Sequence, residues 1–165
     1  MIWSLQTAPD LSEDQFQLWS NLLEERAGIY LNGSQKSLLQ AQVSMRMREI
    51  GQEDYTQYYE LVVDGVNGAL EWSILVDRLV VKETNFFRHK PSSNFVRQLL
   101  QSRIDSSTLD DAFDVWSVGC STGEEPYSLA MLINESFKLA NLDSYFGITA
   151  TDISRVALSV AKKGV

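Results

Sequence analysis

A strand, a glycine-bounded turn and a helix follow one another in the second half of the chain, and this succession most constrains the fold. The run Phe113–Val118 has the length and apolar character of a buried strand, and it ends at Gly119. Helical periodicity follows from Pro126 to Ala140, a second strand-like run covers Tyr145–Thr151, and Ser154 can cap a last helix. Because parallel strands need a crossover helix, the order β-α-β-α predicts a doubly wound α/β sheet.

Residues 1–81 carry a different pattern, with four amphipathic helical segments. Ser12 and Gln15 have the spacing of a capping box, and Gly28 can end the helix that they begin. A second helix is expected over 34–50, and two more follow. The positions expected on the inner faces are Phe16, Trp19, Leu22, Leu23, Leu38, Leu39, Val43, Met47, Ile50, Tyr55, Tyr58, Tyr59, Leu61, Val62, Leu70, Ile74, Leu75, Leu79 and Val80. Four short helices of this kind predict a small all-α domain.

Charge is unevenly distributed along the chain. The 165 residues include 14 Lys+Arg and 22 Asp+Glu, a net charge of −8, which argues against general nucleic-acid binding. Residues 82–104 depart from this balance, with five basic residues and one acidic residue, and are a candidate site for an anion. We therefore expect an all-α domain over 1–81, a basic linker and helix that contribute to a ligand pocket over 82–108, and the first part of an α/β domain over 109–165.

Cysteine and histidine content bears on compartment and metal chemistry. One cysteine excludes an internal disulfide framework, and His89 is the single histidine, so no metal site is expected. There is no charged-then-apolar leader, and no apolar run approaches the roughly 18 residues of a membrane helix. These features favour a cytoplasmic protein that is not inserted in a membrane.

The turn Gly119–Gly123 has two interpretations. It fits the G-x-S-x-G pattern of a nucleophile elbow, in which Ser121 would be the nucleophile of an α/β hydrolase. That interpretation needs an acid and a histidine after Ser121, whereas His89 precedes it. The hydrolase interpretation is weakened by this order and is not excluded.

The second interpretation is a loop that holds a nucleotide-like cofactor at the end of the first strand. Glu124 and Glu125 follow the turn, and Asp152 ends the second strand, where a carboxylate can accept hydrogen bonds from ribose hydroxyls. The chain has neither G-x-G-x-x-G nor a P-loop lysine, so a dinucleotide or nucleoside triphosphate is not favoured. Carboxylates suit a cationic cofactor such as S-adenosylmethionine. A methyltransferase, a hydrolase and a non-catalytic interaction domain all remain open on these residues alone.

Three runs resemble the signatures of CheR-type chemotaxis methyltransferases. They are Val115–Ala130, which contains the glycine turn, Glu83–Arg88, which reads E-T-N-F-F-R, and Thr149–Ser154 at the end of the second strand. The resemblance covers essentially the whole chain and implies a helical domain followed by the start of a Rossmann-like S-adenosylmethionine domain. It implies methyl transfer from S-adenosylmethionine to receptor glutamates, with S-adenosylhomocysteine as product. The flanks of the Glu83–Arg88 run look more like the branch that serves pilus chemosensing.

The resemblance also implies roles for individual residues. It assigns Asp152 to the ribose hydroxyls, Glu125 to the amino-acid end of the cofactor, and Thr84 and Arg88 to the pocket, with Arg88 near the reacting centre. Gly119 begins the cofactor loop. The family often has asparagine where this chain has Lys82, so the cofactor contact at Lys82 is expected to differ in kind.

Further expectations concern residues outside this pocket. The family uses a basic helix of the helical domain to approach chemoreceptor helices, which implies that Arg46 and Arg48 contact the receptor. Phe86 and Phe87 are expected to pack in the core, and Cys120 to be a small buried residue.

Two strands are too few to close a sheet, so the chain is expected to be a piece of a longer protein. In the family, further strands, a tyrosine at the catalytic site and a small β-subdomain follow. The chain alone is therefore expected to be a poor catalyst and to pair with a second copy through its open sheet.

Overall fold

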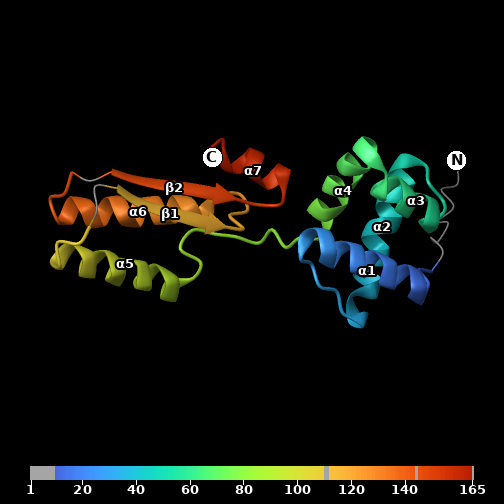
Figure 1. Ribbon diagram of the computed structural model, residues 1–165, viewed down its shortest axis with the longest axis horizontal. Coiled ribbons are helices and arrows are strands. Elements are labelled where there is room, and N and C mark those ends of the chain that lie inside the picture. The colour runs from blue at the N-terminus through green and yellow to red at the C-terminus, as the bar shows by residue number, and fades with distance from the viewer. Residues whose placement is uncertain (1–9, 110–111, 144, 165) are drawn as a thin grey trace, which may run out of the picture. The chain divides into compact units, whose positions relative to one another are not determined.

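The computed structural model describes residues 10–109, 112–143 and 145–164 (Figure 1). Contacts divide the chain between Val80 and Val81 into two compact units. The first contains α1 (Glu13–Ala27), a 3₁₀ turn (Gly33–Gln35), α2 (Lys36–Ile50), α3 (Tyr55–Val63) and α4 (Gly65–Leu79). The second contains α5 (Lys90–Asp105), β1 (Ala112–Val118), α6 (Glu124–Leu139), β2 (Tyr145–Thr151) and α7 (Arg155–Ala161). The order of helices and strands is therefore the predicted one.

The caps predicted for α1, at Ser12 and Gly28, are present in the structure. The Ser12 hydroxyl accepts a hydrogen bond from the Gln15 amide at 3.1 Å, and the Gln15 side chain accepts one from the Ser12 amide at 3.0 Å. Gly28 and Gly51 follow the last residues of α1 and α2. Asp54, which the sequence had not marked, caps α3 by accepting from the amides of Thr56 and Gln57.

The core of this unit is formed by aromatic and aliphatic side chains from all four helices. Trp19 lies at its centre, with its ring 5.6 Å from that of Tyr58 and 5.1 Å, edge to face, from that of Tyr59. Two residues expected inside are exposed instead: Leu38 by 46% and Leu70 by 61%. The buried stripe of α2 passes through positions 39, 43 and 47, and Leu38 lies beside that narrow stripe.

In the second unit, β1 and β2 are parallel, with Ala112 opposite Tyr145 and Val118 opposite Thr151. Figure 1 places α5 and α6 side by side along this pair of strands. A buried cluster joins the two helices to one face of the sheet; its members are Leu100, Phe113, Leu132, Ile133 and Phe137. Helix α7 is tied to α6 by the Tyr127 hydroxyl, which donates to the Ala161 carbonyl at 2.9 Å.

The expectation of a buried first strand holds for one of its two faces. Phe113 and Ser117 are buried, but Trp116 and Val118 are each 66% exposed. Alternate side chains of a strand point to opposite faces, and the helices of this unit cover the face of Phe113 and Ser117. Within the described part of the chain, no helix is both long and apolar enough to cross a membrane.

Val81–His89 precedes α5 without regular secondary structure; we call it the strap. It ends where His89 caps α5, with its ring Nδ1 accepting from the Ser92 amide at 3.3 Å and with Pro91 in the first turn. The strap carries the whole E-T-N-F-F-R run, so its path decides where Thr84 and Arg88 lie.

Candidate functional site

A cavity of about 850 Å³ lies within the second unit, at the carboxyl end of β1. In open α/β sheets this is the end at which ligands bind. Its walls come from the strap, from the first turns of α5, from β1 and the following turn, and from α6. Four residues assigned to a cofactor by sequence line it: Thr84, Arg88, Gly119 and Glu125.

The glycine turn shapes one wall of the cavity. Gly119 has φ +76°, and no atom lies within 4 Å of the position that a Cβ would take there. At Gly123, with φ +105°, a Cβ would lie 3.1 Å from both the Ala161 Cβ and the Tyr127 ring. The positive φ favours glycine at both positions, and at Gly123 the absence of a Cβ also lets α6 approach α7.

Asp152 lies at the end of β2, beside the turn. One carboxylate oxygen accepts from the Ser121 amide at 2.7 Å, and the other accepts from the Ser154 amide at 2.8 Å. A carboxylate offers about four lone-pair sites, so two remain for hydroxyl donors such as those of a ribose. Asp152 is not among the residues that line the cavity, but Ser121, to which it is bonded, is.

Glu125 and Arg88 bring opposite charges to the cavity wall. A Glu125 oxygen accepts from the buried Ser117 hydroxyl at 2.7 Å, which fixes the carboxylate next to β1. The Arg88 guanidinium donates to the Glu83 carbonyl at 2.8 Å, and its side chain stays 55% exposed. A guanidinium has five N–H groups, so Arg88 retains donors for a carboxylate.

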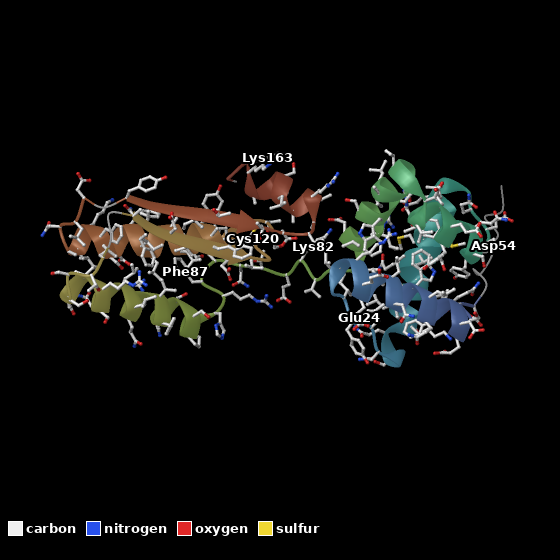
Figure 2. All side chains as sticks on the ribbon, in the orientation of Figure 1. Glu24, Asp54, Lys82, Phe87, Cys120 and Lys163 are labelled. Carbon is white, nitrogen blue, oxygen red and sulfur yellow. The ribbon has the colours of Figure 1, made fainter. Side chains whose placement is uncertain are left out.

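Lys82 is placed at the start of the strap, close to the turn (Figure 2). Its backbone carbonyl accepts from the Ser121 hydroxyl at 3.1 Å. Lys82 is not among the residues that line the cavity, and its main chain is tied to the turn through Ser121.

Ser121 does not have the surroundings of an activated nucleophile. Its side chain is part of a residue only 8% exposed, and its hydroxyl donates to a backbone carbonyl instead of a base. His89 is occupied in capping α5. The neighbouring Cys120 is buried as expected, and burial, followed by the charges of Asp152 and Glu125, raises the pKa of its thiol. The hydrolase interpretation finds no support in this geometry.

The expectation that Phe86 and Phe87 pack in the core was wrong. They are 54% and 41% exposed, and Phe87, labelled in Figure 2, lines the cavity. The strap lies on the surface of the unit, so aromatic side chains on it face solvent or the cavity. Phe87 also has φ +53°, a conformation that is uncommon for a bulky residue.

Arg46 and Arg48, the residues assigned to a receptor, have different surroundings. Arg46 is 16% exposed and binds Glu71 through two of its nitrogens and Glu49 through a third, at 3.0 Å. These carboxylates raise its pKa further. Arg48 is exposed, and its Nε donates to the Ser44 carbonyl at 3.3 Å. The structure therefore gives Arg46 a bracing role between α2 and α4 and leaves Arg48 at the surface.

Ser128 is among the lining residues to which the sequence analysis gave no role of their own. The sequence signal that could have indicated Ser128 is its spacing from Glu125: the two residues are three positions apart on one helix and so share a face. Among residues 10–109, 112–143 and 145–164, no group of three or more His, Cys, Asp or Glu side chains is placed to hold a metal ion.

An α/β unit with a cavity at the carboxyl ends of parallel strands is the class of domain that holds nucleotide-like cofactors. Comparison with protein families makes this specific. Residues 82–165 match the CheR methyltransferase SAM-binding domain, and residues 14–80 match the CheR methyltransferase all-alpha domain. The chain belongs to the CheR methyltransferase family.

Individual relatives agree with this assignment. The chain is similar to the chemotaxis protein methyltransferase of Borreliella burgdorferi, with 26% identity over 94% of this chain and 56% of the relative. It is 28% identical to the chemotaxis protein methyltransferase of Escherichia coli over 94% of this chain and 51% of that protein. The probable biofilm formation methyltransferase WspC of Pseudomonas aeruginosa is 31% identical over 92% of this chain and 34% of its own length. The chain thus spans about half the length of the first two relatives.

Proposed function

We propose that this chain takes part in methyl transfer from S-adenosylmethionine to glutamate side chains of chemoreceptors. The observation that carries the proposal is the cavity at the end of β1, with Thr84, Arg88, Gly119 and Glu125 in its walls. The family match and the names of the relatives supply the reaction class. The relative from Pseudomonas aeruginosa is named a probable biofilm formation methyltransferase, which adds biofilm formation to the candidate pathways.

The residues of the site fit the cofactor in charge. S-adenosylmethionine supplies an electrophilic methyl group on a sulfonium, together with an ammonium, a carboxylate and two ribose hydroxyls. We assign Glu125 to the ammonium, Asp152 to the ribose hydroxyls, and the open backbone at Gly119 to close approach of the ligand. Thr84 contributes a hydroxyl, and Lys82 contributes through its main chain.

Arg88 is the candidate catalytic residue. Its exposed guanidinium can pair in a bidentate way with a carboxylate, either that of the cofactor or that of the incoming glutamate. An ionised glutamate needs no general base, so the task of the site is to align and desolvate it. Alignment of this kind can supply about 7–11 kcal/mol of the barrier.

The receptor surface is proposed to lie on α2, with Arg48 as its exposed cation. Arg46 would support this surface by bracing α2 through Glu71. The methyl-accepting helices of chemoreceptors are the proposed partner, in the cytoplasm.

Calorimetry with S-adenosylhomocysteine on the full-length protein tests the cofactor assignment. Glu125→Gln should weaken binding about tenfold, because a charged hydrogen bond to the ammonium is lost. Glu135→Gln is the matched control, since Glu135 lies on the same helix, pairs with Arg97 at 3.2 Å and does not line the cavity. Equal affinity of Glu125→Gln and the control would refute the role of Glu125.

Methyl transfer is tested with tritiated S-adenosylmethionine and a receptor cytoplasmic fragment. A glutamate methyl ester releases labelled methanol in mild base, whereas N-methyl groups do not. Labelling that resists base would refute glutamate as the acceptor. Receptor binding without any cofactor binding would favour the non-catalytic interaction domain instead.

A further inference from the structure

The strap holds two of the cavity residues that were assigned to the cofactor, Thr84 and Arg88, without the regular backbone hydrogen bonds of a helix or strand. Its position therefore depends on individual contacts. At its beginning, the Lys82 carbonyl accepts from Ser121 at 3.1 Å. Near its end, the Phe87 amide donates to the Ser128 hydroxyl at 3.0 Å. The second contact lies one residue from Arg88.

Ser128 lies on α6 with its hydroxyl oriented to accept the hydrogen bond from the Phe87 amide. Ser128 is 6% exposed, and its O–H donates to the Glu124 carbonyl, one turn earlier. A hydroxyl has one proton and two lone pairs. Because the proton is used within the helix, a lone pair is left for the Phe87 amide.

The contact also holds a local conformation that is unfavourable on its own. Phe87 has φ +53°, which a bulky side chain seldom adopts without support. From this residue the chain continues to Arg88, whose guanidinium reaches back to the Glu83 carbonyl at 2.8 Å. The strap from Glu83 to Arg88 is thus closed on itself and fixed to α6 through Phe87.

We propose that Ser128 is a positioning residue of the cofactor site: it anchors the strap to α6 and so sets the place of Arg88 relative to Glu125. Glu125 lies three residues before Ser128 on the same helix, so both share one face of α6. The cation of the strap and the carboxylate of the helix are thereby held against one rigid element. The effect on cofactor binding rests on the proposed function, whereas the hydrogen bond between Phe87 and Ser128 does not.

The test compares Ser128→Ala with Ser136→Ala in the full chain. Ser136 lies on the same helix and makes the same kind of bond, to the Leu132 carbonyl at 2.9 Å, and it does not line the cavity. Hydrogen exchange of individual amides, followed by NMR, measures the strap directly. Titration with S-adenosylhomocysteine in the same samples measures its consequence.

Ser128→Ala should increase the exchange rate of the Phe87 amide at least about tenfold and weaken S-adenosylhomocysteine binding about tenfold. Ser136→Ala should leave both values unchanged. Ser128→Thr, which keeps the hydroxyl, should restore protection.

Protection of the Phe87 amide in Ser128→Ala equal to that in Ser136→Ala would overturn the proposal. So would a matching ligand affinity in these two variants. A wild-type protein that fails to bind S-adenosylhomocysteine would refute the proposed function, and the exchange rates would still decide whether Ser128 anchors the strap.

Discussion

Replacing Asp152 with alanine should destabilise the second unit as well as weaken its ligand binding. The carboxylate joins the turn after β1 to the turn after β2 through the amides of Ser121 and Ser154, at 2.7 and 2.8 Å. Both of these residues are buried, with exposures of 8% and 0%. Their N–H groups would lose their partner together.

The structure sets the size of the effect. A hydrogen bond to a charged group contributes about 1.5–3 kcal/mol, so two would contribute about 3–6 kcal/mol. Since the bonds lie at a part-buried edge, water can hydrogen-bond to the freed amides and recover part of this free energy. We therefore expect a loss of about 3 kcal/mol for Asp152→Ala. For a domain of 60–100 residues this lowers the melting temperature by roughly 12–24 °C. Asp152→Asn keeps one acceptor and should lose about half as much.

Thermal unfolding followed through the amide signals of β1 and β2 isolates the transition of this unit from that of the helices. Asp114→Asn is the matched control, because Asp114 is an exposed aspartate on the neighbouring strand; it should change stability by less than about 0.5 kcal/mol. At a temperature where both variants are folded, Asp152→Ala should bind S-adenosylhomocysteine about tenfold to a hundredfold more weakly. An unchanged melting temperature would refute the tie between the turns, and an unchanged dissociation constant would refute the ribose assignment.

Ser121→Ala should leave methyl transfer within a few-fold, and the wild type should not react with a serine-directed phosphonate probe, because the hydroxyl donates to a backbone carbonyl; stoichiometric labelling of Ser121 would revive the hydrolase interpretation. Arg46→Met should lower the free energy of unfolding of the helical unit by about 2–4 kcal/mol, measured in urea, because it leaves a mostly buried Glu71 unpaired. Lys36→Gln, which breaks a more exposed pair, should cost less than about 1 kcal/mol, and equal costs would contradict the bracing role. Arg78 and Arg46 lower the pKa of Glu49 below its usual 4.5, so its contribution to stability is present above that value and is lost as pH falls through the folded-state pKa. In Glu49→Gln, the free energy of unfolding should therefore fall less steeply as the pH is lowered. An unchanged pH dependence in this variant would contradict the role of Glu49 in the acid-dependent loss of stability.

Local signals in the sequence predicted the elements well. Ser12 with Gln15, and Ser154, mark helix starts, and their side chains make the expected caps. The second strand was predicted with the bounds that the structure gives it, Tyr145–Thr151. Caps and strand periodicity depend on a few neighbouring residues, so they can be read without knowledge of the rest of the fold.

Errors arose where burial depends on distant partners. Trp116 is apolar and lies in a strand, yet it is exposed because the helices of its unit cover the opposite face. Arg46 was assigned to a receptor contact by the resemblance, and Glu71, the residue that binds it in the structure, is 25 positions away in the sequence. Neither fact can be derived from local spacing.

The sequence predicted several residues of the candidate site but not the backbone conformation that holds them. The positions of Thr84, Arg88, Gly119 and Glu125 around one cavity agree with the resemblance, since family motifs record which residue types gather. The sequence carried no sign that Phe87 has φ +53°. Such backbone details follow from contacts that a linear pattern does not contain.

The division of the chain between Val80 and Val81 has a consequence for synthesis in the cell. The buried core of the helical unit is formed by residues 11–76, with Leu79 and Val80 packed against it, so all of these residues belong to the first unit. Ribosomes add about 5–20 residues per second, whereas helical domains rich in local contacts fold in microseconds to milliseconds. The bundle should therefore be complete before β1 and β2 have both been made, and translation would set the order in which the two units form.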